Sequence, residues 1–209
     1  SLSIRTDLLS PAYVRGLKSL QDQVPPFSSS EARDIIEEEL GVPLGEVFSE
    51  FPEEPVAAAS LGQVYRARLR ADGREVAIKV QRPDIMNQIA IDMHLIREIA
   101  PVLKRTFNLN TDLEGTVDAW GSGFVDELDY VREAGHAVDF SRAIAETPLS
   151  GAVFAPEPLE HLTSRKVLTT TWVEGQRLDY VADATAEGEL RRKRRVSQLC
   201  GVAMNSYLT

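Results

Sequence analysis

The sequence has little cysteine, little histidine and fewer basic than acidic residues. Cys200 is the one cysteine, so no disulfide can form within the chain, and we expect an intracellular protein. The three histidines are widely separated, which excludes a zinc site of the usual Cys/His spacing. Twenty-three basic against 32 acidic residues give a formal net charge of −9, which argues against a nucleic-acid binder. No apolar run approaches the roughly 20 residues that a membrane-spanning helix needs.

What the chain does have is the composition of an ordinary globular protein. Its 209 residues are 43% hydrophobic and 26% charged, which is typical of soluble domains. The length suffices for one domain or for one and a half, and for a substantial buried core. The sequence contains neither internal repeats nor low-complexity tracts. We therefore expect a folded unit, with room for part of a second one.

The first 50 residues are predicted to be mostly helical. Ser10 and Pro11 are typical of the N-cap and first position of a helix. The tetrapeptide Ser28-Ser29-Ser30-Glu31 is a capping box that predicts the start of a second helix. Gly41 is placed to end that helix in a left-handed conformation.

The pattern changes at Pro55, from helical spacing to short runs of small and β-branched residues. Residues 63–69 alternate, so that every second side chain falls on one face of a strand. The pair Asp72-Gly73 follows, and it is a strong signal for a hairpin turn. Residues 75–80 then predict the second strand of that hairpin.

The remainder of the chain is predicted to alternate between helices and short strands. Hairpin-linked strands with helices between them favour an α+β fold with an antiparallel sheet. The expected elements are a helix over 85–103, a second from about residue 112 or 120 to 144, strands at 152–154 and 166–173, and a last helix from about residue 187.

The segment that indicates chemistry is residues 57–64, AAASLGQV. It fits the frame of the kinase nucleotide loop, G-x-G-x-x-G-x-V, with alanine at the first two glycine positions. Lys79 ends a V-A-I-K strand motif at kinase spacing from Val64, with the hairpin turn between them. Small residues let backbone approach nucleotide phosphates, and the lysine supplies positive charge to them. A packed strand turn would explain the loop alone, but loop, hairpin and lysine together favour a nucleotide site.

A kinase lysine needs an acidic partner on a following helix. The segment 127–133 supplies Glu127, Asp129 and Glu133. Asp129 and Glu133 are four residues apart, so they are predicted to share one helix face, whereas Glu127 is predicted to lie about 200° away from Asp129. A solvated acidic face is the alternative interpretation of this segment.

Taken together, these motifs identify a family resemblance that covers nearly the whole chain. The chain resembles the UbiB/AarF family of atypical protein-kinase-like proteins. The sequences of residues 111–134 and 168–175 most resemble those of the plastid and cyanobacterial branch of this family. The resemblance rests on SIRTDLL (3–9), LQDQVPPF (20–27), AAASLGQVYRA (57–67), VAIKVQRP (76–83) and ELDYVREA (127–134).

The resemblance implies a kinase-like N-lobe with an antiparallel sheet, preceded by a helical extension that folds over the active site. The implied division is an extension over residues 1–50, an N-lobe over 51–180, and the first helix of a C-lobe over 181–209. The C-lobe would then be mostly missing. Within residues 181–209, Val196, Leu199, Cys200, Ala203 and Tyr207 recur at helical spacing.

That apolar stripe predicts a helix whose partners follow Thr209 in a longer parent protein, the remainder of the kinase C-lobe. The alternative is a terminal helix that docks on this domain. A basic run at residues 191–195 is most simply one exposed helical turn. It could also contact anionic lipid headgroups.

The resemblance also implies roles for individual residues. Lys79 would contact the nucleotide and pair with Glu133, while Glu127 and Asp129 match an E-x-D signature beside the metal. Trp172 and Val173 stand where a kinase hinge would touch adenine. The nucleotide-binding residues would be Ala57, Ala58, Ala59, Ser60, Gly62, Val64, Ala77, Lys79, Trp172 and Val173.

The implied function is binding of ATP or ADP with Mg²⁺, and ATP hydrolysis or phosphoryl transfer that supports isoprenoid-quinone or prenyl-lipid metabolism at membranes. The 209 residues contain neither the H-x-D-x-x-x-x-N nor the D-F-G motif. We therefore expect them to be catalytically inactive by themselves. A pseudokinase module that binds nucleotide or lipid without turnover is the alternative. The helical extension and ELDYVREA disfavour an ordinary protein-kinase lobe.

Overall fold

The computed structural model describes residues 24–106 and 126–175, together with positions 115, 121, 123, 196 and 199. Its centre is an antiparallel sheet with the strand order β1-β3-β4-β5, in which β2 also pairs with β3. The strands are β1 (Phe48–Glu50), β2 (Ala57–Ala58), β3 (Gly62–Leu69), β4 (Glu75–Gln81) and β5 (Val167–Thr171). The helices are α2 (Ser29–Leu40), α3 (Leu44–Val47), α4 (Ile85–Thr106), α6 (Tyr130–Ala145) and the 3₁₀ turn η2 (Glu160–Leu162).

β3 and β4 form the predicted hairpin at the centre of the sheet. Their register runs from Gly62 opposite Gln81 to Arg68 opposite Glu75. In the connecting loop Gly73 has a φ of 73°, a left-handed conformation that glycine adopts without a steric penalty. The strands and turn expected from residues 63–80 are therefore confirmed.

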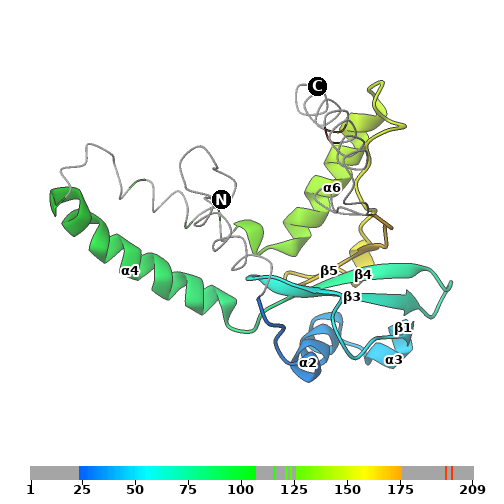
Figure 1. Cartoon of the computed structure of the whole chain (residues 1–209). Coiled ribbons are helices and arrows are strands. Elements are labelled where there is room, and N and C mark those ends of the chain that lie inside the picture. The colour runs from blue at the N-terminus through cyan, green and yellow to red at the C-terminus, as the bar shows by residue number, and fades with distance from the viewer. Residues whose placement is uncertain are drawn as a thin grey trace, which may run out of the picture.

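One face of this sheet is the hydrophobic core. Because side chains alternate along a strand, every second residue of β3 and β4 points to the same side. α2 and α3 cover that side (Figure 1), where Ala32 and Ile36 of α2 are fully buried. The buried strand residues are Tyr65, Ala67 and Leu69 from β3 and Val76, Ile78 and Val80 from β4.

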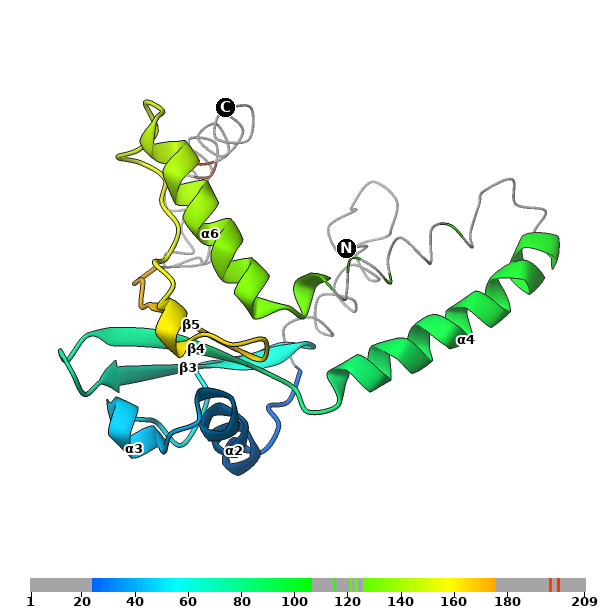
Figure 2. The same ribbon diagram turned by 180° about the vertical axis from the view of Figure 1, so that it is seen from behind.

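α6 lies on the opposite face of the sheet, and α4 extends away from the sheet as an arm (Figure 2). Tyr130 and Ala134 of α6 form a small buried cluster with Leu168 of β5. The two faces of the sheet thus have different roles: one carries the core, and the other carries α6 on part of its area.

The start of α2 agrees with the sequence in position but not in capping chemistry. Ser28 is the N-cap residue, yet its side chain makes no capping hydrogen bond. Its hydroxyl instead pairs with the hydroxyl of Ser30 at 2.6 Å, so the predicted capping box does not form. Gly41 ends the helix with a φ of 71°, as expected. The helix expected from Ser10 lies outside the described residues.

The prediction of one continuous helix through residues 127–133 is wrong. Asp129 has an extended backbone with φ −103° and ψ 94°, and it caps α6 instead of lying within it. Its Oδ1 accepts a hydrogen bond from the Val131 amide at 3.2 Å. An aspartate side chain that binds a nearby amide competes with the helix and favours a helix start. Asp129 and Glu133 therefore do not share a helix face.

The prediction of a strand at residues 152–154 is also wrong. The amides of Ala152 and Val153 both donate to the Leu149 carbonyl, which closes a turn, and no strand forms there. The position beside β5 is occupied by residues further along the chain, where Pro158 forms an isolated bridge with Thr170 of β5. Among the described residues, no strand pairs with this three-residue apolar run.

The short elements α3, β1 and η2 were not predicted, because runs of three and four residues are too short to show a period. The last predicted helix lies outside the described residues except for positions 196 and 199. The division at residues 50 and 180 stays a prediction. None of the helices in the described part of the chain combines the length and the hydropathy required to span a bilayer.

Candidate functional site

The face of the sheet that carries α6 presents a row of paired residues across four strands. Ala57 of β2 pairs with Val64 of β3, Val64 pairs with Lys79 of β4, and Lys79 pairs with Leu168 of β5. Directly paired residues of antiparallel strands point to the same side. Ala57 is exposed and Val64 and Lys79 are half-buried, whereas Leu168 is covered by α6. The row therefore ends in an accessible surface at the alanine-rich loop.

Lys79 and Glu133 form the ion pair expected of a kinase-like site. The Lys79 Nζ lies 2.7 Å from Oε2 and 2.9 Å from Oε1 of Glu133, although 54 residues separate them in sequence. Their side chains are 34% and 44% exposed, so the pair is accessible from solvent. A carboxylate that binds an ammonium group through both oxygens fixes the position of that charge.

The packing of α6 places Glu133 at this distance. The Tyr130 amide donates to the Arg165 carbonyl at 3.2 Å, which joins the start of α6 to the residues before β5. Ala134 and Tyr130 then pack on Leu168, the residue opposite Lys79 in the sheet. Glu133 lies between these two contact residues in the first turn of α6 and reaches Lys79 from there.

Tyr130 lies below the lysine. The Lys79 Nζ is 4.3 Å from the centre of its ring, within the range of a cation–π contact. The side chain is fully buried, and its hydroxyl has no hydrogen-bond partner among the described residues. Burial, and secondarily the negative charge of Glu133, raise the pKa of Tyr130 above its usual value. Both effects favour the neutral form of the phenol.

The alanine-rich loop is a tight turn between β2 and β3. The Ala59 amide donates to the Gly62 carbonyl at 2.8 Å, and residues 59 and 60 are exposed. Gly62 is buried where β3 meets β4. A side chain there would place its Cβ 2.3 Å from the Val80 carbonyl oxygen and 3.2 Å from the Tyr130 hydroxyl. Gly62 thus shapes the base of the loop, whereas Ala59 and Ser60 form its accessible tip.

The two candidate metal ligands are placed close to the start of α6. Glu127 is exposed, and Asp129 uses one carboxylate oxygen to cap the helix. No group of three potential ligands occurs in the described part of the chain. Mg²⁺ in nucleotide sites commonly takes only one or two carboxylates, and phosphate oxygens and water complete its shell. Two carboxylates at the start of α6, the helix that also carries Glu133, fit that requirement.

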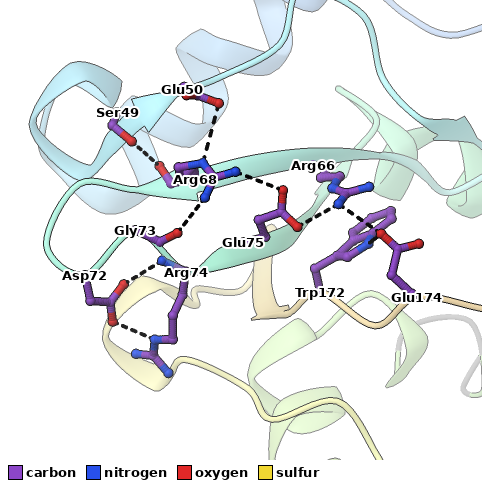
Figure 3. A network of polar contacts seen from close by, with 10 residues as sticks. All are labelled: Ser49, Glu50, Arg66, Arg68, Asp72, Gly73, Arg74, Glu75, Trp172 and Glu174. Carbon is purple, nitrogen blue, oxygen red and sulfur yellow. Dashed lines mark hydrogen bonds and ion pairs between the residues drawn. The ribbon is translucent and has the colours of Figure 1, made fainter.

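Trp172 and Val173 are placed at the other end of the sheet from the alanine-rich loop. The Trp172 amide donates to the Glu75 carbonyl at 3.0 Å, and its indole Nε1 donates to Glu174 at 3.0 Å. The Arg66 guanidinium lies 4.7 Å from the Trp172 ring centre (Figure 3). Both N–H groups of Trp172 are thus used within the protein, while Val173 is 40% exposed. Contact of either residue with adenine stays a prediction.

The network around Arg66 holds this end of the sheet together. Arg66 bridges Glu75 at 2.6 Å and Glu174 at 2.9 Å, and Arg68 binds the second oxygen of Glu75 at 3.2 Å (Figure 3). The hydrogen bond from Arg66 holds the pKa of Glu75 below its usual value. The chain that follows β5 is therefore fixed to β3 and β4.

Sequence reasoning missed three residues on the site face. Leu168 and Thr170 lie opposite Lys79 and Ala77, and Tyr130 lies under Lys79. Ala77, which was predicted, is half-buried on the same face. The register between β4 and β5 would have revealed Leu168 and Thr170, but no local pattern fixes the register of strands so far apart in sequence.

Residues 19–208 match the model of the ABC1 atypical kinase-like domain. A relative from Arabidopsis thaliana, described as an uncharacterized aarF domain-containing protein kinase, chloroplastic, is 45% identical over 183 residues, which are 88% of this chain and 26% of the relative. The "Probable protein kinase UbiB" of Aeromonas salmonicida is 38% identical over 176 residues, 83% of this chain and 32% of the relative. This chain thus spans about a quarter to a third of these relatives.

A solved structure has the same fold. The complex of Rv3197 with erythromycin from Mycobacterium tuberculosis superposes with a TM-score of 0.61 at 29% identity and covers 89% of this chain and 46% of that chain. The agreement confirms the α+β fold class with an antiparallel sheet. Because the family model matches almost the entire sequence, and the aarF and UbiB proteins are relatives, this chain belongs to the ABC1 atypical kinase-like family.

Proposed function

We propose that this chain is the ATP-binding part of an atypical kinase or ATPase. The observation that carries the proposal is the two-oxygen contact between Lys79 and Glu133, at 2.7 and 2.9 Å. The paired residues Val64 and Ala57 lead from Lys79 to the alanine-rich loop. A positive charge fixed in this way is suited to bind the α- and β-phosphates of a nucleotide.

Each part of the site has a proposed role. The loop tip of Ala59 and Ser60, small and exposed, would let phosphate oxygens approach the backbone. Val64 and Ala77, half-buried on the same face as Lys79, would contact the sugar and base. Ala57 and Ala58 would border the phosphates, and Trp172 with Val173 would form the far wall.

The proposed cofactors are ATP or ADP with Mg²⁺. Glu127 and Asp129 would hold the metal, which would neutralise developing phosphate charge. The exposed position of Glu127 and the second carboxylate oxygen of Asp129 support this role. Glu133 is assigned to Lys79 rather than to the metal, since both of its oxygens contact the lysine.

The proposed setting is isoprenoid-quinone or prenyl-lipid metabolism. The relatives named UbiB and chloroplastic aarF kinase, together with the UbiB/AarF motifs, support it. The partners would be a prenyl lipid or a membrane surface, and the remainder of a kinase C-lobe in the whole protein. A plastid or cyanobacterial membrane is the proposed location. With a net charge of −9, nucleic acid is not a proposed partner.

A second candidate is nucleotide or lipid binding without turnover. It is favoured by the alanines that replace glycine in the loop, and by the lack of the H-x-D-x-x-x-x-N and D-F-G motifs in these 209 residues. Release of phosphate from ATP separates the two candidates. We expect the 209-residue chain to bind nucleotide without hydrolysis, and robust Mg²⁺-dependent hydrolysis would contradict that expectation.

Titration calorimetry with MgADP and MgATP tests the proposed site. We expect Lys79→Ala to weaken binding at least tenfold, about 1.4 kcal/mol, because the phosphates lose their fixed charge. Lys166→Ala is the matched control, since Lys166 also pairs with a helix glutamate, Glu39 at 3.0 Å, but directly precedes β5. Equal affinities in the wild type and Lys79→Ala would count against the proposal.

A further inference from the structure

We propose that Arg82 is a positioning residue that clamps the alanine-rich loop to the segment 24–28, which precedes α2. The clamp is a property of the fold, and its effect on nucleotide affinity rests on the proposed function. Arg82 directly follows β4, so it stands beside the base of the loop on the neighbouring strand.

Arg82 makes three hydrogen bonds that converge on these two segments. Its side-chain Nε donates to the Ala59 carbonyl at 3.0 Å, and its Nη2 donates to the Pro25 carbonyl at 2.6 Å. Its own amide donates to the Leu61 carbonyl at 3.0 Å. A guanidinium group presents several donors in a rigid plane, so one side chain holds both carbonyls in a fixed relative position.

The segment before α2 is held from a second direction. The Phe27 amide donates to Oε1 of Gln63 at 3.1 Å, and the Gln63 amide group donates to the Tyr65 hydroxyl at 2.6 Å. That hydroxyl donates to Ser29 at 3.1 Å. The Phe27 ring also lies 5.7 Å from the Arg82 guanidinium carbon. The segment is therefore a rigid support against which Arg82 can hold the loop.

The loop needs such a support because its own side chains give it little anchorage. Ala57, Ala59 and Ser60 are exposed, and side chains this small bury little apolar surface. Within the turn, the bond from the Ala59 amide to Gly62 fixes one end only. The Arg82 contact to the Ala59 carbonyl fixes the same residue from the other side, which limits how far the turn can open.

Arg70 provides a matched control. Its Nε donates to the Gly45 carbonyl at 2.7 Å, and its Nη2 donates to the Phe48 carbonyl at 3.3 Å. It thus makes the same kind of two-carbonyl contact between a strand end and a neighbouring segment. It follows β3 at the end next to β1, whereas the alanine-rich loop joins the other end of β3.

Amide hydrogen exchange measured by NMR on the whole 209-residue chain tests the clamp without any ligand. We expect the Ala59 amide to exchange at least tenfold faster in Arg82→Ala than in the wild type, and within twofold of the wild type in Arg70→Ala. Arg82→Lys can reach one carbonyl only and should give an intermediate rate; it carries the test if Arg82→Ala does not fold. An unchanged Ala59 rate in Arg82→Ala would overturn the clamp.

Calorimetry with MgADP then tests the consequence for binding. Arg82→Ala should bind about five- to tenfold more weakly than the wild type, and Arg70→Ala should bind within twofold of it. Faster exchange with unchanged affinity would overturn the positioning role. If the wild type itself fails to bind MgADP, the proposed function falls, while the exchange comparison still decides whether the clamp exists.

Discussion

Tyr130 contributes an aromatic ring beneath Lys79 and a buried hydroxyl that bonds to nothing among the described residues. The ring stabilises the ammonium group through its negative face, and the side chain must stay neutral to remain buried. A buried phenol of this kind links the stability of the fold to alkaline pH.

We predict that Tyr130→Phe makes the protein less sensitive to alkali. Burial raises the pKa of Tyr130 in the folded chain, whereas the unfolded value is about 10. Its stabilising contribution is therefore complete below about pH 10 and is lost above it, by up to about 1.4 kcal/mol per pH unit. Urea unfolding at pH 8 and about pH 11 measures this effect. An equal loss of stability in both proteins would contradict the assignment.

Gly62 is required because the Val80 carbonyl and the Tyr130 hydroxyl lie where a Cβ would stand. We predict that Gly62→Ala lowers the free energy of unfolding by about 1–3 kcal/mol, since the new Cβ overlaps the Val80 carbonyl oxygen. Gly135→Ala is the control: it lies inside α6 with open space around it, and should raise stability by about 0.5–1 kcal/mol. Thermal unfolding of the two variants in parallel decides the matter, and equal midpoints would contradict this explanation.

At the scale of elements, Gln81 joins the end of β4 to the starts of α6 and β5. Its Nε2 donates to the Leu128 carbonyl and, at 2.9 Å, to the Arg165 carbonyl. The side chain is 4% exposed, so its loss would leave the Leu128 carbonyl without this donor in a buried position. The Arg165 carbonyl would keep its bond from the Tyr130 amide. The Gln81 amide thus helps to fix the position of α6 on the sheet, and with it the position of Glu133 relative to Lys79.

We predict that Gln81→Leu destabilises the fold by about 1–3 kcal/mol, the cost of leaving the buried Leu128 carbonyl unpaired. Gln88→Leu, at an exposed position on α4, should change stability by no more than about 0.5 kcal/mol. Chemical denaturation of both variants gives the comparison. Equal effects of the two substitutions would show that Gln81 does not connect these elements.

The elements differ in how far the sequence predicts them. The β3–β4 hairpin has alternation and a turn glycine within a few residues, so local information suffices. The start of α6 was missed because Asp129 has an ordinary helical context in sequence, and only its hydrogen bond to the Val131 amide marks the break. The run 152–154 has the local composition of a strand. Whether it pairs depends on the distant β5, which no local pattern reveals.

At the scale of the whole molecule, the sheet lies between the hydrophobic core on one face and the candidate site on the other. α2 and α3 cover one face, and α6 lies over part of the other (Figures 1 and 2). On that second face Ala57 is exposed, and Val64 and Lys79 are half-buried. The pairing of Lys79 with Glu133 was expected from family resemblance, and the structure brings the two together across 54 residues. The supporting residues Leu168, Gln81 and Arg82 were not predicted, because their contacts depend on strand register and loop placement.

We propose that Lys79 and Glu133 act as one unit in holding a nucleotide. A double-mutant cycle for MgADP affinity, with Lys79→Ala, Glu133→Ala and the double variant, measures the coupling between the two residues. We predict that each single variant binds more weakly than the wild type. The double variant should bind within twofold of Lys79→Ala, since Glu133 acts through the lysine. If the losses of binding free energy in the two single variants add in the double variant, the two residues do not act as one unit. MgADP affinities that do not change in any variant would also contradict this proposal.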